Sequence, residues 1–392
     1  MKRRATDLDH LLLPDRTLLF VCIVLLCGGL VMLTSASVSL AENTTGQPFY
    51  YLQQQLLAVF VGLLGGALVL RIPSDVWERA GLVLALLAML LLLVVLVPGL
   101  GRTVNGATRW VSAGGINIQV SEPARLLLLM WLAGYAVRQQ EELHETWQGF
   151  FKPMVVVGVA AVLLLLQPDF GATTVLMAIS LGVLFVAGGR LKYFVVCVGA
   201  VVGLLAALAV LSPYRLKRIT GFLDPWADPF DSGFQLTQSL IAIGSGDVFG
   251  LGLGNSVQKL FYLPEAHTDF IFAVLAEEFG LLGVITVLAL FLLLVTRIML
   301  IGVMAHRKGR PFAGFVAYGI GLWLGLQAVV SVGVNLGALP TKGLTLPLIS
   351  SGGSSMLMTL IALGFVLRIK YELDRDNGSI PVTRKNLNGG KG

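Results

Sequence analysis

The chain has 392 residues, of which 56% are hydrophobic and only 13% are charged. A soluble domain is normally about 25% charged, so this composition excludes an ordinary soluble enzyme and indicates an integral membrane protein. The net charge of +6 does not require a nucleic-acid partner, because most basic residues gather in short segments between apolar runs.

Ten apolar runs of the length that spans a bilayer follow one another along the chain. They cover residues 17–38, 54–71, 79–98, 122–137, 153–167, 171–189, 192–212, 279–303, 312–334 and 352–369. Pro168, Asp169 and Gly171 form a turn signal that separates the fifth run from the sixth. The sequence therefore predicts an all-α polytopic membrane protein with about ten transmembrane helices.

The basic residues orient these spans. With the N-terminus inside, most of the 28 lysines and arginines fall on cytoplasmic segments, as the positive-inside rule requires. An odd number of spans would place the basic C-terminal tail outside, so ten spans with both termini in the cytoplasm fit best. A signal peptide is the alternative for the N-terminus, since Ser39-Leu40-Ala41 resembles a cleavage site. The first apolar run, however, exceeds the usual length of about 7 to 15 residues.

This orientation divides the chain into a cytoplasmic tail (1–16), a membrane domain (17–372) and a disordered cytoplasmic tail (373–392). The longest connection is an outer loop, residues 213–278, between the seventh and eighth spans. A loop of this length in a compact protein is usually functional or disordered. Its apolar spacing predicts a short amphipathic helix along the membrane surface, formed around Leu236, Leu240, Ile241 and Ile243.

Two polar clusters lie on the outer side in the first half of the chain. Arg109 precedes the fourth span, and Glu122 and Arg125 stand three residues apart at its start, where one helical face can pair them. This pair is either a structural ion pair or part of a site wall. Asp169 lies in the turn QPDFGATT, where it is either a helix cap or a member of the same site.

A third cluster leads into the eighth span. Its glycines, in GLGLGN, mimic a nucleotide-binding loop, but no βαβ pattern surrounds them, which argues against a dinucleotide site. Lys259, Glu265, His267 and Asp269 follow in one short segment. Acids at membrane depth usually face a cavity or a partner. If the segment from Asp269 is helical, Asp269 shares a face with Glu277; a helix N-cap is the alternative role for Asp269.

The fourth cluster is NLGALPTKGLTLPLISSGGSS, which contains Lys342 and Ser354. A broken segment at membrane depth is tolerated where it lines a cavity. Exposed backbone N–H groups with a lysine would suit a phosphate or pyrophosphate, whereas an ordinary re-entrant loop would need neither. The four histidines are scattered, so no metal cage is visible. Spacing alone permits an enzyme acting on a lipid-linked substrate or a transporter, and it does not choose between them.

The third and fourth clusters together carry a specific resemblance. LPEAHTDFIFA followed by LPTKGLTLPLISSGGSS resembles the SEDS family (shape, elongation, division and sporulation), and the similarity extends from the first span to about residue 372. GATRW, QPDFGAT and DPWADPFDSGFQLTQS occur in the expected order, and Lys342 favours the division branch or its sporulation relative. The chain departs from the family pattern at a few positions: Val120, Arg125, Asp247, Val248 and Ser351.

The resemblance implies a peptidoglycan glycosyltransferase of the division septum, active on the outer face of the bacterial inner membrane. It would transfer a lipid-linked glycan chain onto the 4-hydroxyl of lipid II and release undecaprenyl pyrophosphate, with Asp269 as the general base. The residues expected to bind pyrophosphate are Arg109, Lys259, Lys342 and Ser354. The residues expected to support the cavity are Glu122, Arg125, Asp169, Glu265, His267 and Glu277. A divalent cation, Mg²⁺ or Mn²⁺, is a candidate cofactor without an assigned ligand set.

The resemblance also implies partners. We expect a class B penicillin-binding protein transpeptidase of the FtsI type, divisome membrane proteins of the FtsQ, FtsL, FtsB and FtsN types, and no nucleic acid. Two other functions stay open: a lipid II flippase, which needs access from both leaflets, and a non-catalytic scaffold, which needs none of the cavity charges. Glu277 and Glu278 are explained at this point only as cavity or interhelical partners.

Overall fold

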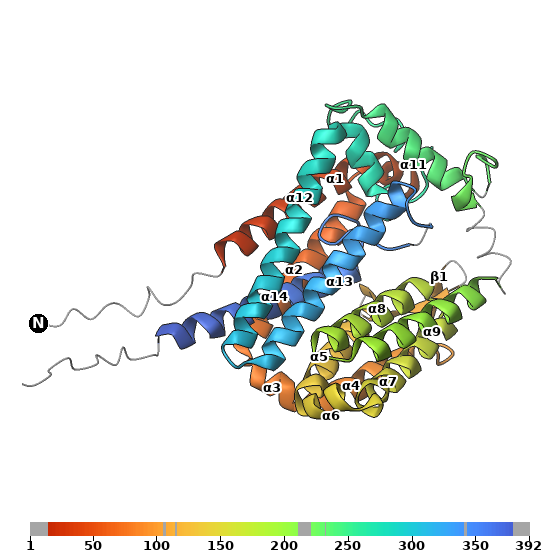
Figure 1. Ribbon diagram of the computed structural model, residues 1–392. Helices are drawn as coiled ribbons and strands as arrows, with labels where there is room; N and C mark the ends of the chain where they lie inside the picture. Colours follow the sequence, from red (N-terminus) through yellow and green to blue (C-terminus); the bar gives the residue numbers. More distant parts are fainter. Residues whose placement is uncertain are drawn as a thin grey trace, which may run out of the picture.

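The computed structural model describes residues 15–104, 107–113, 116–210, 221–231, 233–340 and 343–378. Helices account for most of this chain (Figure 1), as expected where no water is available to the backbone. The helices are α1 (Arg16–Thr45), α2 (Tyr50–Arg71), α3 (Ser74–Arg79), α4 (Gly81–Val94), α5 (Ser121–Arg138), α6 (Gln140–Glu145), α7 (Trp147–Leu166), α8 (Phe170–Val186), α9 (Leu191–Val210), α11 (Phe234–Ser245), α12 (Ile271–Arg307), α13 (Pro311–Asn335) and α14 (Gly353–Gly378).

Each of the ten predicted apolar runs coincides with one of these helices. Among the described residues, α1, α2, α7, α12 and α13 are each long and apolar enough to cross a membrane. Shorter apolar helices are α4, α8 and the Leu191–Leu204 part of α9. The all-α polytopic membrane class is therefore confirmed, while the number of ten crossings stays a prediction. The first 14 residues and those after Gly378 lie outside the described part, and α14 continues into the segment predicted to be a disordered tail.

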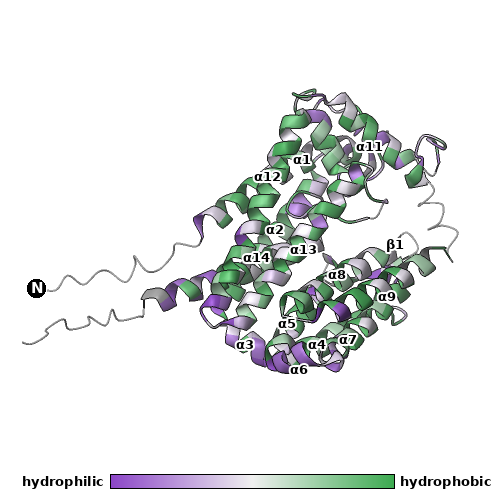
Figure 2. Ribbon diagram, viewed as in Figure 1, coloured by the Kyte–Doolittle hydropathy of each residue, from purple (hydrophilic) through white to green (hydrophobic). Residues whose placement is uncertain are grey.

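The outer surface of the helices is apolar, as a lipid-facing surface requires. Figure 2 shows hydrophobic residues along the helices and hydrophilic ones gathered at α3 and α6. Leu82 and Leu86 of α4 and Leu68 of α2 are among the exposed side chains. Large apolar side chains exposed in such numbers would be a liability in water. In a bilayer these side chains contact lipid acyl chains instead of water.

Two groups of helices form the bundle (Figure 1). In one group α14 packs along α2 and α12 along α13; in the other, α4 packs along α5 and α7 along α8. The α2–α14 contact depends on glycine, because a Cβ added at Gly364 would lie 2.8 Å from Gly66 Cα. Helix α13 contacts both α5 and α8, so it joins the two groups.

A small antiparallel sheet, which the sequence analysis did not predict, precedes α5. Its strands are β1 (Gly101–Val104), β2 (Ala107–Ala113) and β3 (Ile116–Gln119), in the order β1-β2-β3. Trp110 of β2 pairs with Arg102 on one side and Gln119 on the other. The sheet and α11 lie at one end of the bundle, here called the outer end, and α3 and α6 lie at the opposite, inner end.

The predicted helix in the long outer connection is present as α11. Its residues Leu236 and Ala242 are buried, while Ile241 is exposed. The helix packs on α12 and α13. Its position along a membrane surface stays a prediction. Residues 213–220 and 232 of the same connection lie outside the described part.

Candidate functional site

Asp269 lies in a turn immediately before α12, not on the helix. The helix begins at Ile271 with Phe270 at its N-cap, so Asp269 neither shares a face with Glu277 nor occupies the cap position. Both sequence interpretations of its local structure were wrong. The tight turns of LPEAHTDF delay the helix, and Glu265 adopts a positive φ of 56° there. The Glu265 carbonyl accepts hydrogen bonds from the N–H groups of Thr268 and Phe270.

A buried amide holds this turn. Asn335, at the end of α13, is fully buried, and its Nδ2 donates to the Asp269 carbonyl at 2.9 Å. Its Oδ1 accepts at 3.1 Å from the N–H of Ala273 in the first turn of α12, and the same N–H also donates to the Phe270 carbonyl. The Asp269 side chain is half-buried, and a Cβ added at Gly343 would stand 3.0 Å from its Oδ2. The backbone of Asp269 is thus held by the end of α13, and its carboxylate lies beside Gly343.

His267 is buried beside the same turn. Its ring lies 4.6 Å from that of Tyr51, and its carbonyl accepts from the N–H of Ser351 at 3.0 Å. Burial lowers the pKa of His267, and the negative charge of Glu265 opposes this shift. Nδ1 of this ring has no hydrogen-bond partner within the described part of the chain. His267 therefore links the turn to Tyr51 of α2 and to Ser351.

The segment 343–352 joins the two helix groups at the outer end. Leu344 packs against Gly171 on α8, because a Cβ added at Gly171 would lie 3.4 Å from Leu344 Cδ2. On the other side, Gln55 of α2 accepts from the N–H of Gly352 at 3.2 Å and donates to the carbonyl of Ser350 at 3.1 Å. This segment is consequently a well-bonded connection between α13 and α14. Lys342 lies outside the described residues.

Ser354 at the start of α14 is bonded to the sheet. Its hydroxyl accepts from the N–H of Gln119 at 2.9 Å and donates to the carbonyl of Asn117 at 3.2 Å. The side-chain amide of Gln119 in turn donates to Asp169 Oδ2 at 2.9 Å. Ser354 and Asp169 are thus brought together through β3, a link that no motif in the sequence indicated.

Asp169 caps α8, as the first of its two interpretations predicted. Its Oδ1 accepts from the N–H of Ala172 at 3.1 Å. Arg109 of β2 lies against it, with 3.7 Å between NH1 and Oδ1, and also donates to the carbonyls of Gln167 and Pro168. The Arg109 side chain is 32% exposed. Among the basic residues predicted for the site that the structure describes, Arg109 is the one whose charged group is partly exposed to solvent.

Glu122 and Arg125 form a buried ion pair inside the bundle. Their side chains are 7% and 2% exposed, and NH2 of Arg125 lies 3.1 Å from Oε1 of Glu122. The Arg125 guanidinium also stands 5.1 Å from the ring centre of Trp323 on α13. The ion pair that the three-residue spacing predicted is therefore present, and its place in a site wall stays a prediction.

Glu277 and Glu278, just before the eighth apolar run, both bind the loop that precedes α12. Glu277 accepts from Ser256 Oγ at 2.5 Å and from the N–H of Val257 at 3.0 Å. Glu278 pairs with Lys259, whose Nζ lies 2.7 Å from Oε1 and 2.9 Å from Ser35 Oγ of α1. Lys259 is engaged in this buried pair, and we assign it a structural role.

The backbone of α12 breaks beside these acids. Gly280 adopts φ 63° and ψ −161° inside the helix, a conformation that only glycine adopts readily. The break releases the carbonyls of Glu277 and Glu278, which accept from the N–H groups of Leu251 and Gly252. The sequence showed the two glycine-containing stretches but gave no sign that they pair.

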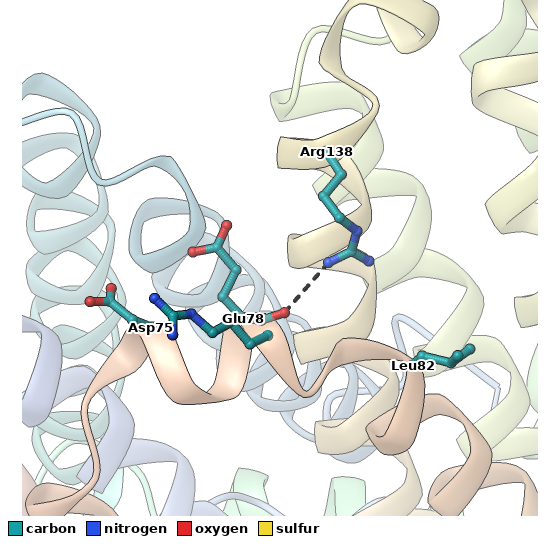
Figure 3. A pocket seen from close by; sticks show the side chains of 5 residues that line it. Asp75, Glu78, Leu82 and Arg138 are labelled. Carbon is teal, nitrogen blue, oxygen red and sulfur yellow. Dashed lines mark hydrogen bonds between the residues drawn. The ribbon is translucent and has the colours of Figure 1, made fainter.

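A shallow pocket also exists at the inner end. Asp75, Glu78, Leu82 and Arg138 line it, and Arg138 donates to the Glu78 carbonyl at 3.5 Å (Figure 3). Burial, with the neighbouring Asp75 charge, raises the pKa of Glu78. The pocket lies at the opposite end of α5 from the sheet, so it is separate from the Asp269 site. Within the described residues, no three His, Cys, Asp or Glu side chains are grouped to hold a metal ion.

Comparison with known proteins gives consistent results. A family model described as "Cell cycle protein", covering FtsW, RodA and SpoVE, matches residues 16–375. A relative from Thioalkalivibrio sulfidiphilus, named probable peptidoglycan glycosyltransferase FtsW, is 52% identical over 96% of this chain and 94% of its own length. A relative from Coxiella burnetii with the same name is 51% identical over 92% of this chain and 97% of its own length.

Two solved structures share the fold. One, titled "Structural coordination of polymerization and crosslinking by a peptidoglycan synthase complex", has a TM-score of 0.75 at 32% identity and covers 92% of this chain and 99% of its own. The other is the rod shape determining protein RodA of Thermus thermophilus, with a TM-score of 0.68 at 31% identity, covering 92% of this chain and 97% of its own. The helical architecture is therefore shared along almost the whole chain.

Proposed function

We propose that Asp269 is the general base of the reaction that this chain catalyses. The chain belongs to the cell cycle protein family of FtsW, RodA and SpoVE and is a peptidoglycan glycosyltransferase. The enzyme is a multi-pass membrane protein. We place its work at the division septum, on the outer face of the inner membrane, with lipid II as the acceptor.

The position of Asp269 carries this proposal. Glu122, Asp169, Glu277 and Glu278 are all at least nine-tenths buried and hold helix ends, strands or loops. Asp269 differs because its side chain is half-buried, at a turn fixed by Asn335. A partly exposed carboxylate on a turn whose backbone is held in place suits the role of a general base.

The proposed step is a displacement at the anomeric carbon of the donor. Asp269 takes the proton of the acceptor 4-hydroxyl as that oxygen forms its bond to the anomeric carbon. The bond from this carbon to the pyrophosphate oxygen breaks, and undecaprenyl pyrophosphate leaves with the electron pair. Proton transfer of this kind contributes about 10²- to 10⁴-fold to the rate.

Cations would stabilise the leaving pyrophosphate. We retain Arg109, which is partly exposed, and Lys342, which the sequence places one residue before the Gly343 contact with Asp269. We withdraw Lys259 and Ser354 from the pyrophosphate set, because one is buried in an ion pair and the other bonds to β3.

A crosslinking partner fits the same proposal. The structural neighbour described above is titled as a complex that coordinates polymerisation with crosslinking. We infer that this chain works with a class B penicillin-binding protein. Contacts with proteins of the FtsQ, FtsL, FtsB and FtsN types remain predictions of the sequence resemblance.

The decisive experiment compares wild type with Asp269→Asn. Each is purified with its transpeptidase partner, whose serine nucleophile is inactivated, and is given labelled lipid II in a gel assay for glycan polymer. We expect polymer from wild type and none from Asp269→Asn, with lipid II binding retained. Asp247→Asn is the matched control, because Asp247 is an exposed outer acid at φ 46°, a conformation that asparagine also tolerates.

Each other outcome has a defined meaning. Polymer from Asp269→Asn at the wild-type rate would refute the general-base role. No polymer even from wild type, under conditions where lipid II binds, would favour a flippase. Loss of polymer in Asp247→Asn as well would show that the outer acids act through folding and not through chemistry.

A further inference from the structure

In the segment Val248–Tyr262, between α11 and α12, apolar side chains are exposed and most polar side chains are buried. Its apolar side chains are exposed, among them Phe249 at 81% and Leu253 at 54%, together with Val248, Leu251, Val257, Leu260, Phe261 and Tyr262. Three of its polar side chains are buried, with Ser256 2% exposed and Gln258 and Lys259 each 9% exposed, whereas Asn255 is exposed. Lys259 is also the only charged residue of the segment. A loop in water normally shows the opposite pattern.

Specific bonds hold the segment in this arrangement. Glu277 and Glu278 bind its buried Ser256 and Lys259, as described above. The N–H groups of Leu251 and Gly252 donate to helix carbonyls at 2.9 Å and 3.0 Å. Ser256, Lys259 and these backbone groups are therefore paired within the protein, as irregular backbone in a membrane requires, while Oε1 of the buried Gln258 has no hydrogen-bond partner within the described residues. The exposed apolar face is a fixed surface.

This face continues into the lipid-facing side of α12. The N–H groups of Leu281 and Leu282 donate to the carbonyls of Asp247 and Val248, so the segment lies directly beside the helix after its break. Leu281 and Leu282 are themselves exposed, and the exposed stripe continues through Ile285, Leu288 and Leu292. α12 is one of the helices long and apolar enough to span a membrane.

We propose that Val248–Tyr262 lies in the outer leaflet of the membrane, with its exposed apolar side chains among the lipid acyl chains. The exposed face of the segment is largely apolar, carries no exposed charge and is continuous with a transmembrane surface. Lipid therefore suits this face better than water does. Tyr262 lies at the end that leads back to the polar turn before Asp269, and tyrosine is enriched at that interfacial depth. The proposal does not depend on the catalytic role of Asp269.

Spin-label accessibility tests this placement. The full chain, with Cys22, Cys27 and Cys197 replaced by alanine, is reconstituted alone into nanodiscs of phosphatidylethanolamine and phosphatidylglycerol. Labels are attached at Leu253→Cys and, separately, at Leu260→Cys. Leu282→Cys on α12 is the lipid control, and the exposed Asn43→Cys at the end of α1 is the water control. Collision with oxygen, which concentrates in lipid, is compared with collision with a water-soluble nickel chelate.

We expect oxygen to relax the labels at 253 and 260 several-fold more effectively than the nickel chelate, as at 282. Equal or greater access of the nickel chelate, as at 43, would place the segment in water and overturn the proposal. Shielding from both reagents would indicate coverage by a second copy of the chain and would overturn it as well. A monodisperse elution profile for every variant checks that the labelled proteins are folded.

Discussion

The two ends of the bundle are both fastened by glutamates, but under opposite conditions. At the outer end, Glu278 and Lys259 form a pair whose side chains are 0% and 8% exposed. At the inner end, Glu372 of α14 accepts from Ser74 of α3 and pairs with Arg310 and Arg368, and the Arg310 side chain is 30% exposed. The outer pair has almost no contact with water, whereas the inner cluster keeps some.

This difference sets the expected energies. Removing one partner of a fully buried pair leaves an uncompensated charge, which destabilises a protein strongly. Removing one partner of a hydrated cluster costs less, because water and neighbouring charges take its place. The outer end should therefore be more sensitive to single substitutions than the inner end, although both use the same residue types.

The largest effect should come from Lys259→Met. The substitution leaves the Glu278 carboxylate buried without its cation, and we expect the free energy of unfolding to fall by about 3–5 kcal/mol. Denaturant titration in mixed micelles, followed by tryptophan fluorescence, measures it. The double variant Lys259→Met/Glu278→Met removes both charges and should recover most of the loss. A fall below about 1 kcal/mol for the single variant, the range of exposed pairs, would remove the contrast between the two ends.

Gly280→Ala should have the next largest effect. Alanine at φ 63° and ψ −161° is strained by about 1–3 kcal/mol, and its Cβ would stand 2.4 Å from Gly250 N. We expect the segment Val248–Tyr262 to separate from α12 and to become sensitive to protease added from outside. Gly244→Ala on α11 is the control, because no atom lies within 4 Å of its added Cβ. Equal protease resistance of both variants would show that the break does not hold the segment.

Glu372→Gln should have a smaller, pH-dependent effect of about 1 kcal/mol near neutral pH. Burial by itself raises the pKa of Glu372, but hydrogen bonds from Ser74 and the charge of Arg368 outweigh it, and the net pKa is lowered from its ordinary 4.5. A lowered pKa gives stability that is present above about pH 4.5 and is lost as the pH falls through the folded-state value.

The pH dependence of Tm measures this contribution. Wild type should lose stability on acidification through this window, and Glu372→Gln should lose less because it lacks the titrating group. Parallel curves for the two proteins would mean that Glu372 is not the anchor of the inner end.

Lys370→Ala should have the smallest effect. Lys370 pairs with Asp374 one turn further along α14, and the Asp374 side chain is 46% exposed. Pairs of this kind contribute about 0.3–0.5 kcal/mol. The same denaturant titration should show a change at the limit of detection, and a loss comparable to that of Lys259→Met would contradict the ranking by burial.

Much of the architecture was predictable because lipid imposes a simple rule on sequence. Long apolar runs must be helical in a bilayer, so the ten runs identified ten of the helices. The spacing of Leu236 and its neighbours likewise predicted α11. The sheet was missed, although the dipeptides Asn105-Gly106 and Gly114-Gly115 separate its short runs and are strong hairpin signals. The expectation of an all-α chain left these signals unused.

The sequence predicted the contacts of site residues that are neighbours in the chain, but not the contacts between residues far apart in the chain. Cap chemistry predicted the role of Asp169, and three-residue spacing predicted the Glu122–Arg125 pair, since both depend on neighbours in sequence. The role of Asn335 was not predictable, because its partner Asp269 is 66 residues away in the chain. The same is true of Ser354 and Gln119, which are 235 residues apart.

The sequence by itself determined that this protein is helical, lies in a membrane and carries an acid, Asp269, in the segment before its eighth apolar run. Composition, charge bias and local spacing are sufficient for these conclusions, because each depends on residues close together in the chain. Only the tertiary structure decided which charges face inward. The resemblance implied a pyrophosphate-binding role for Lys259, and the sequence left Glu277 and Glu278 as cavity or interhelical partners. In the structure Lys259 pairs with Glu278, and Glu277 binds Ser256 and the N–H of Val257. The break at Gly280 brings the two stretches together, and the burial that results makes those charges structural.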